Sequence, residues 1–284
     1  IVKLVAHGPA ASLLALPKRK SLLRAPWSDP APSLTGAHYL VLERVRGGDL
    51  YAFLSKFERA HGHPLPEETA CEIFRGIAAG LAHCHSCGVV HRDLKIENVL
   101  LTNDGVKLID FGLSHAHSLD SDGSWANEQL LDICGSNGYI APEVVLSREP
   151  GSGYAADVWS LGVCLVAMLG GFMPFAADQR RFASQVRVLR RAQEEGRSAT
   201  RAIFGWFPPR WCNLSVGAIS LIDSLLALNP RERPSVATVL QHPWICRHSH
   251  GEECAIEREG PASPDEATTS TRDPTRNGQF WVLV

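Results

Sequence analysis

The sequence predicts an α+β fold, with a few strands near the N-terminus and a larger helical part after them. Ile1–Val5 and Tyr39–Glu43 are rich in β-branched and apolar residues, which is typical of strands. From Glu67 to Ser86, apolar residues recur at helical spacing. The apolar run Val158–Leu169 indicates a second, buried helix. Strands followed by a run of helices are the pattern of an α+β fold.

Composition narrows the class of protein further. The formal net charge of −2 gives no overall basic field, so we expect no nucleic acid as a partner. The apolar run Val158–Leu169 is too short to cross a bilayer, so we expect no membrane span. The eight cysteines are scattered, which is typical of reduced thiols in an intracellular protein. We therefore expect a location in the cytoplasm or the nucleus.

Three short blocks of the sequence contain the candidate catalytic residues. Val90–Leu101 reads V-H-R-D-L-K-I-E-N-V-L-L, and Asp110–Gly112 and Ala141–Glu143 follow it as D-F-G and A-P-E. In order and spacing, these blocks resemble the catalytic motifs of eukaryotic-type protein kinases. The resemblance runs from about Tyr39 to Trp244. It implies a bilobal fold with a mostly helical large lobe and, in this chain, an incomplete β small lobe.

The resemblance implies four catalytic residues, and ATP and Mg²⁺ as cofactors. Asp93 would accept the proton of the substrate hydroxyl or orient that hydroxyl. Lys95 would place a cation near the transferred phosphate. Asn98 and Asp110 would supply oxygen ligands, which suit the hard cation Mg²⁺.

The resemblance also implies a division of the chain. Residues 1–42 would be the remnant of the small lobe, with a long insertion at about 7–36 that is rich in Pro, Ala and Ser. Residues 43–248 would hold the hinge and the large lobe. The polar tail, residues 249–284, is expected to be disordered.

A nucleotide site at the hinge follows from the same resemblance. Backbone groups of Glu43 and Val45 would face the adenine edge. Asp49 would reach the ribose. Leu100 would form the floor under the adenine ring. In isolation the stretch is equally compatible with an ordinary strand and a Gly-Gly turn.

Regulatory and structural roles are implied for further residues. Arg92 precedes the catalytic Asp93, and such an arginine can pair with an activation-loop phosphate. An upstream activating kinase is therefore a possible partner. Ser136 stands where serine/threonine kinases contact the catalytic Asp and Lys. Asp157 would accept hydrogen bonds from the catalytic-loop backbone, and Glu143 and Arg233 would form a buried ion pair.

Cysteines and histidines gather at the end of the predicted helix Glu67–Ser86. They are His83, Cys84, His85 and Cys87. No second C-x-x-C and no suitable H-x-x-x-H follows them. Because the family carries a helix end here, we expect a structural role and not a zinc site.

The function implied is ATP-dependent transfer of the γ-phosphate to Ser or Thr hydroxyls of protein substrates. Lys95 favours this specificity, because tyrosine kinases usually differ there. Gln241–Ile245 resembles the end of a kinase domain of the calcium/calmodulin-kinase-like group.

Part of a kinase small lobe is missing from the sequence. Before the strand-like start there is no G-x-G-x-x-G loop, no V-A-I-K-like strand and no helix C glutamate. Because the chain also begins at Ile1 and not at Met, we expect a fragment of an active kinase. The alternative is a noncatalytic kinase-like scaffold or pseudokinase. The retained catalytic residues favour the enzyme, since a scaffold has no need of them.

Overall fold

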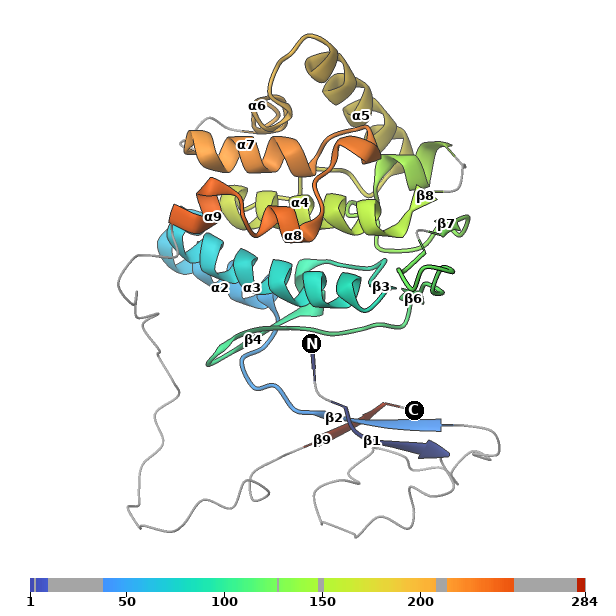
Figure 1. Ribbon diagram of the computed structural model, residues 1–284. Helices are drawn as coiled ribbons and strands as arrows, with labels where there is room; N and C mark the ends of the chain where they lie inside the picture. The colour runs from blue at the N-terminus through green and yellow to red at the C-terminus, as the bar shows by residue number, and fades with distance from the viewer. Residues whose placement is uncertain are drawn as a thin grey trace, which may run out of the picture. The chain divides into compact units, whose positions relative to one another are not determined.

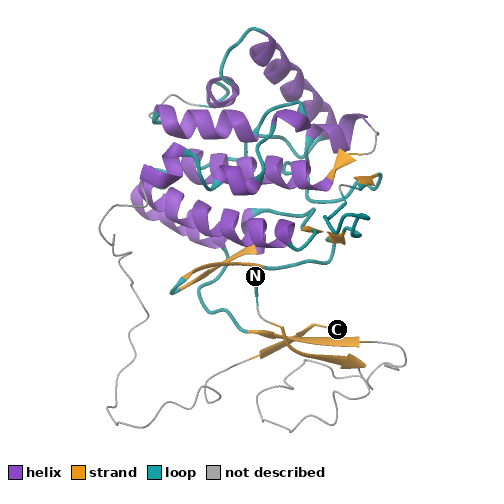
Figure 2. Cartoon of the chain, viewed as in Figure 1, coloured by secondary structure: helices purple, strands orange, loops and turns teal. Residues whose placement is uncertain are grey.

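The computed structural model describes residues 1–2, 4–9, 38–126, 128–147, 151–207, 214–247 and 280–283 (Figure 1). The chain divides into two compact units, Ile1–Arg46 with Glu252–Val284 and Gly47–Gly251. Helices dominate the second unit, in which the strands are short (Figure 2).

The first unit contains a three-stranded antiparallel sheet in the order β1-β2-β9. Its strands are β1 (Leu4–Pro9), β2 (His38–Glu43) and β9 (Phe280–Leu283). β1 begins at Leu4, three residues later than the start of the predicted strand Ile1–Val5, and continues into the predicted insertion. The rest of that insertion lies outside the described residues.

The last residues of the chain differ from the predicted disordered tail. Residues 280–283 form β9 and pair with β2, although the tail was expected to be disordered. Phe280, Trp281, Val282 and Leu283 are apolar residues in a tail that is polar overall, and Phe, Trp and Val favour strands. The composition of the whole tail therefore did not indicate this strand. Residues 248–279 lie outside the described part of the chain.

The second unit is built around α4 (Gly153–Gly170), which packs against α3 (Glu67–Ser86) and α7 (Val216–Leu225) (Figure 1). Almost all α4 side chains are buried, and Trp159 is fully buried. By length and composition α4 could cross a membrane, but 83% of it is buried inside the unit. That burial is typical of a central core helix.

Capping explains why α4 is longer than the apolar run within it. The Ser152 side chain accepts a hydrogen bond from the Ala155 backbone N–H at the N-terminus. At the C-terminus, Gly171 adopts the left-handed conformation at φ 68° and donates to the Ala167 carbonyl. A glycine takes this conformation without the steric cost of a Cβ.

The helix α3 has the bounds that its apolar spacing predicts. It is preceded by α2 (Leu50–His61), which ends at Gly62 in the left-handed conformation. Cys84 lies buried near the end of α3, and burial raises its pKa to about 11. The thiol therefore stays protonated at neutral pH.

Three short two-stranded sheets position the loops of the site. They pair β3 (Val89–Val90) with β6 (His115–Ala116), β4 (Val99–Thr102) with β5 (Gly105–Leu108), and β7 (Gln129–Leu130) with β8 (Gly151–Ser152). A short 3₁₀ turn, Ile96–Asn98, leads into β4. β5 packs against α3, which anchors the β4–β5 hairpin to the core.

The remaining helices are short, except for α5. They are α5 (Gln179–Glu194), α6 (Ala199–Phe204), α8 (Val236–Val239) and α9 (Pro243–Arg247), together with a π-helical turn at Glu143–Ser147 and a 3₁₀ turn at Pro230–Glu232.

Candidate functional site

The loop between β3 and β4 is held by one buried carboxylate. Asp157, in the second turn of α4, is 1% exposed. Its Oδ1 accepts a hydrogen bond from the Arg92 backbone N–H at 2.8 Å, and its Oδ2 accepts from the His91 N–H at 2.8 Å. Oδ2 also lies 2.9 Å from Nε2 of His85 on α3. The core helix therefore fixes the loop that carries Asp93.

Replacing Asp157 by alanine is expected to destabilise the protein and to loosen this loop. Two backbone N–H groups would lose their acceptor, at about 1–3 kcal/mol for each buried unsatisfied group. Asp157→Asn keeps one acceptor oxygen and is expected to fall between the wild type and Asp157→Ala. Thermal unfolding followed by circular dichroism measures the order. Equal melting temperatures for all three proteins would contradict this role.

Polar side chains converge on Asp93, which is 7% exposed. Lys95 Nζ donates to Asp93 Oδ2 at 2.8 Å and to Ser136 Oγ at 2.6 Å. Asn98 Nδ2 donates to the Asp93 carbonyl at 2.9 Å and reaches Oδ2 at 3.3 Å. Lys95 thus joins Asp93 to Ser136, which lies 41 residues further on in the chain.

The second oxygen of Asp93 is buried and has no hydrogen-bond partner among the described residues. Buried polar atoms are nearly always paired, so an unpaired carboxylate oxygen beside a lysine calls for an explanation. An incoming hydroxyl group would satisfy it. The site can therefore accept a proton or a hydrogen bond at this atom.

Asn98 and Asp110 offer oxygen atoms of the kind that Mg²⁺ prefers. The Asn98 amide donates both of its hydrogen bonds to Asp93, which leaves its amide oxygen as the group that can ligate a cation. Asp110 is exposed, and one of its carboxylate oxygens accepts from the Gly112 N–H at 3.3 Å. The Ile109 N–H donates to the Asn98 carbonyl at 3.0 Å, which places the two segments side by side. One amide and one carboxylate fit a cation that takes its other ligands from water and phosphate.

His91 links the catalytic loop to the D-F-G segment. Its Nε2 lies 3.1 Å from the Ile109 carbonyl, and its Nδ1 lies 3.3 Å from the Asp93 N–H. These contacts fit the neutral tautomer with its proton on Nε2. The ring also packs on Phe111, with ring centroids 4.7 Å apart.

The backbone is strained at two of the site residues. Arg92 and Asp110 have positive φ angles of 65° and 62°. Such angles are rare outside glycine and tend to occur at functional sites, where the surrounding structure maintains them. Asp157 supplies that support for Arg92 through the bond to its N–H.

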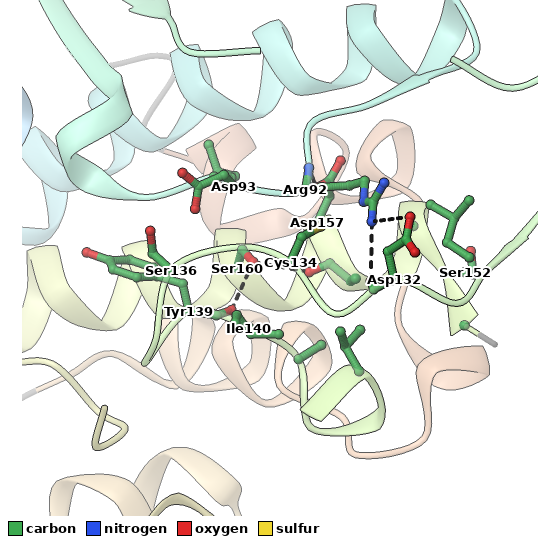
Figure 3. Close-up of a pocket in the computed structure, with 17 residues that line it drawn as sticks. Arg92, Asp93, Asp132, Cys134, Ser136, Tyr139, Ile140, Ser152, Asp157 and Ser160 are labelled. Carbon is green, nitrogen blue, oxygen red and sulfur yellow. Dashed lines mark hydrogen bonds and ion pairs between the residues drawn. The ribbon is translucent and has the colours of Figure 1, made fainter. Parts of the chain in front are cut away.

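The Arg92 side chain reaches across to the segment before Ser136. One guanidinium nitrogen donates to the Asp132 carbonyl at 3.2 Å and lies 3.9 Å from the Asp132 carboxylate (Figure 3). Asp132 is 86% exposed, so this charge pair is weak. Arg92 and Asp132 line a pocket together with Cys134. Burial raises the pKa of the Cys134 thiol. The role of Arg92 toward a phosphate remains a prediction.

The predicted nucleotide-contacting residues fall into both units. Glu43 ends β2 and Val45 follows it in the first unit, whereas Asp49 and Leu100 lie in the second. Asp49 caps α2 by accepting from the Ala52 N–H at 2.8 Å. Leu100 lies on β4, in an antiparallel bridge with Asp49. The structure thus gives Asp49 a capping role that the sequence did not predict.

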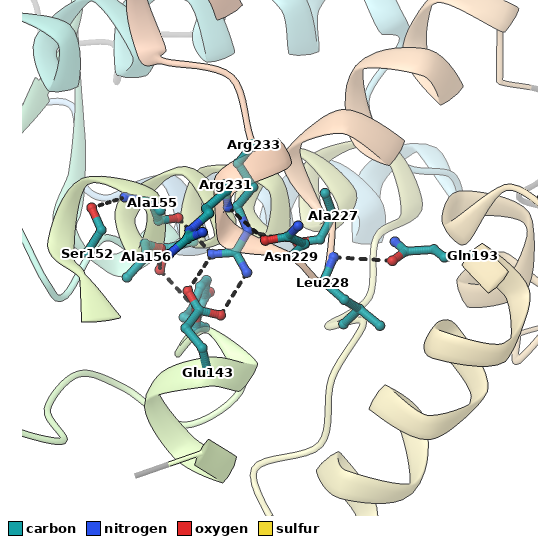
Figure 4. A network of polar contacts seen from close by, with 12 residues as sticks. Glu143, Ser152, Ala155, Ala156, Gln193, Ala227, Leu228, Asn229, Arg231 and Arg233 are labelled. Carbon is teal, nitrogen blue, oxygen red and sulfur yellow. Dashed lines mark hydrogen bonds and ion pairs between the residues drawn. The ribbon is translucent and has the colours of Figure 1, made fainter. Parts of the chain in front are cut away.

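Glu143 and Arg233 form an ion pair on the other side of α4 (Figure 4). The two guanidinium NH₂ groups bind the two carboxylate oxygens at 2.6 and 2.7 Å. The Arg233 side chain is fully buried, and it also donates to the Ala227 and Ala155 carbonyls. The guanidinium lies over the Trp159 ring, 5.1 Å from its centroid.

Sequence reasoning missed a cluster of His115, His117 and Glu128. The only signal in the sequence was the H-x-H spacing, because alternate residues of a strand share a face. Glu128 comes from the other side of a long loop, which gave no pairing signal. The predicted role of the His83–Cys87 group agrees with Cys84 being buried and with His85 bonding Asp157.

Comparison with known proteins gives consistent matches. The family described as "Protein kinase domain" matches residues 33–245. The calcium/calmodulin-dependent protein kinase type II alpha chain of Drosophila melanogaster is 35% identical over 215 residues, which are 74% of this chain and 36% of that protein. The maternal embryonic leucine zipper kinase of Danio rerio is 38% identical over 214 residues, 75% and 28% of the two chains. The serine/threonine-protein kinase DCLK3 of Homo sapiens is 32% identical over 231 residues, which are 80% of this chain and 31% of that protein. The chain therefore spans about a third of the length of these relatives.

Proposed function

This chain belongs to the protein kinase family, and on that premise we propose that it is part of a serine/threonine kinase. The enzyme would transfer the γ-phosphate of ATP to Ser or Thr hydroxyls of protein substrates. The observation that carries the proposal is the buried, unpaired carboxylate oxygen of Asp93 beside the Lys95 ammonium. We further propose that the β1-β2-β9 sheet includes what this chain holds of the small lobe.

Each residue of the site has a separate task in this reaction. The free oxygen of Asp93 accepts the hydrogen bond of the substrate hydroxyl and later its proton. Lys95 stabilises negative charge that develops on the transferred group. Asn98 and Asp110 would hold Mg²⁺, which would neutralise charge on the phosphates of ATP. Catalysis of this kind depends on positioning and electrostatics, both of which the fixed loop provides.

The nucleotide would lie against the hinge predicted from the sequence. Backbone groups of Glu43 and Val45 would bind the adenine edge, and Leu100 would contact the ring. Asp49 uses one carboxylate oxygen to cap α2, so its second oxygen is the one proposed for the ribose.

The groove beside Ser136 supports a substrate preference. Its apolar walls include Ile133, Ile140, Val145 and Phe182, and the uncharged Asn137 and Gln179 also line it. An apolar side chain would fit these walls better than a charged one, because an unpaired charge is costly to take out of water. We therefore propose an apolar residue directly after the phosphorylated Ser or Thr.

A set of peptide substrates tests the proposed function. Three peptides differ only in the acceptor, which is Ser, Thr or Tyr, and two more place Leu or Asp directly after a Ser acceptor. We expect transfer of phosphate to Ser and Thr but not to Tyr, and a rate at least tenfold higher with Leu than with Asp. Binding of peptides without any transfer would favour the scaffold alternative. Transfer to Tyr alone would contradict the proposed specificity.

A further inference from the structure

Two histidines and a glutamate meet at the base of the loop that follows the D-F-G segment. His115 lies on β6, His117 follows it, and Glu128 directly precedes β7. Their ligand atoms all lie within 4.8 Å of one another. His115 Nε2 is 2.9 Å from Glu128 Oε2, and His117 Nδ1 is 3.8 Å from the same oxygen. In the described part of the chain no other group of three or more such side chains meets this criterion.

His117 supplies an independent observation. Its side chain is fully buried, and both ring nitrogens lack a hydrogen-bond partner among the described residues. Buried polar groups are normally paired, so this imidazole is an exception that calls for a ligand. A neutral imidazole has the free lone pair that a metal ion needs.

The carboxylate is oriented toward the two histidines. Glu128 Oε1 accepts hydrogen bonds from both the hydroxyl and the backbone N–H of Ser118, the latter at 3.0 Å. These bonds fix the orientation of the Glu128 carboxylate. Its other oxygen, Oε2, is the one that faces His115 and His117. Hydrogen bonds to the outer oxygen of a ligating carboxylate are typical of metal sites.

The surroundings of the cluster also restrain His117. The ring of Tyr154, in the first turn of α4, stacks on the His117 ring with centroids 4.7 Å apart. The His117 backbone N–H donates to the Gly88 carbonyl at 2.8 Å. His115 and Glu128 are each about one third exposed, so an ion has a path from solvent.

We propose that His115, His117 and Glu128 bind a divalent transition metal ion, with Zn²⁺ as the best match. Two imidazoles and a carboxylate are a ligand set that zinc takes, with a fourth position for water. Adjacent ligand atoms in a tetrahedral zinc site are about 3.3 Å apart. His117 Nδ1, at 3.8 Å from Glu128 Oε2, would move closer, and His115 Nε2, at 2.9 Å, would move slightly away. The ion would replace the hydrogen bond between His115 Nε2 and Glu128 Oε2, and His115 would ligate as a neutral imidazole with its ring proton on Nδ1.

The bound ion would link His115 and His117, which precede the loop 118–126, to Glu128, which follows it. This loop is already folded back on itself, since the Ala126 N–H donates to the Ser118 carbonyl at 2.9 Å. From His117 the contacts continue through Tyr154 and His85 to Asp157, which holds the catalytic loop. The metal site is separate from the proposed Mg²⁺ site at Asn98 and Asp110.

Metal titration of the 284-residue chain tests the proposal. The protein is freed of metal with a chelator and is then titrated with Zn²⁺ in competition with a chromophoric chelator. We expect one tight equivalent of Zn²⁺ in the wild type, and at least tenfold weaker binding in both Glu128→Gln and His115→Gln. The matched control is His83→Gln, which removes a separate pair of potential ligands, His83 Nε2 and Cys87 Sγ at 3.9 Å, and is expected to leave the affinity unchanged.

A second measurement needs only the wild type. Co²⁺ in place of Zn²⁺ should give visible absorption bands of a nitrogen- and oxygen-ligated ion, without the near-ultraviolet charge-transfer band of a thiolate ligand. A thiolate band, loss of binding in His83→Gln, or the absence of any tight equivalent would overturn the proposal. Because both readouts are metal binding, they do not depend on the proposed phosphotransfer activity.

Discussion

Asp93→Asn is expected to reduce kcat for peptide phosphorylation by about 10²–10⁴-fold, the range for loss of a general base. The amide keeps the shape of the side chain and can still accept from Lys95, but it cannot take up the proton of the substrate hydroxyl. KM for ATP is expected to change little, because the proposed metal ligands are Asn98 and Asp110. Steady-state kinetics with the natural polypeptide that carries this sequence measures both constants.

The matched control is Asp104→Asn, the same substitution in the exposed turn of the β4–β5 hairpin. It tests whether a charge change near the site is enough to affect turnover, and we expect kcat to stay within twofold of the wild type. An Asp93→Asn enzyme with wild-type kcat would remove Asp93 from the mechanism. An equal loss in both variants would point to a general effect of charge.

Arg233→Met is expected to lower the free energy of unfolding by about 3–5 kcal/mol. Methionine fills much of the volume but leaves the Glu143 carboxylate, which is 14% exposed, without its bidentate partner. The Ala227 and Ala155 carbonyls lose a donor as well. Urea unfolding followed by circular dichroism measures the change.

Two further variants separate the ion pair from packing. The double substitution of Arg233→Met with Glu143→Gln also removes the carboxylate charge that faced the arginine, so it is expected to be more stable than Arg233→Met alone. Arg191→Met breaks the exposed pair with Glu195 and is expected to leave stability unchanged, because solvent screens such pairs. A loss below 1 kcal/mol in Arg233→Met would contradict the account of the buried pair.

The site residues that lie close together in the chain could be predicted from the sequence. Asp93, Lys95 and Asn98 lie within six residues, so their spacing alone brings them together. Ser136 lies 41 residues from Lys95, and only the resemblance to a family placed it there. Helix α3 was predictable because its buried face repeats at helical spacing over the whole element.

Other features depend on contacts that no local sequence pattern indicates. The cluster of His115, His117 and Glu128 needs Glu128 to return to β6 across a loop rich in Ser, Asp and Gly, and such a loop has no hydrophobic periodicity. Strand β9 is four residues long within a polar tail, so composition conceals it. The capping of α2 by Asp49 depends on the conformation of the backbone that follows it, which the sequence pattern did not indicate.

The most direct test of the central claim is phosphate transfer by the protein isolated from its natural source. The protein is incubated with γ-labelled ATP, Mg²⁺ and a peptide that contains Ser, Thr and Tyr, and the labelled amino acids are identified after hydrolysis. We predict labelled phosphoserine or phosphothreonine, no phosphotyrosine, and loss of the label in Asp93→Asn. Absence of transfer from the natural protein under these conditions would contradict the kinase proposal and favour a binding role for this fold.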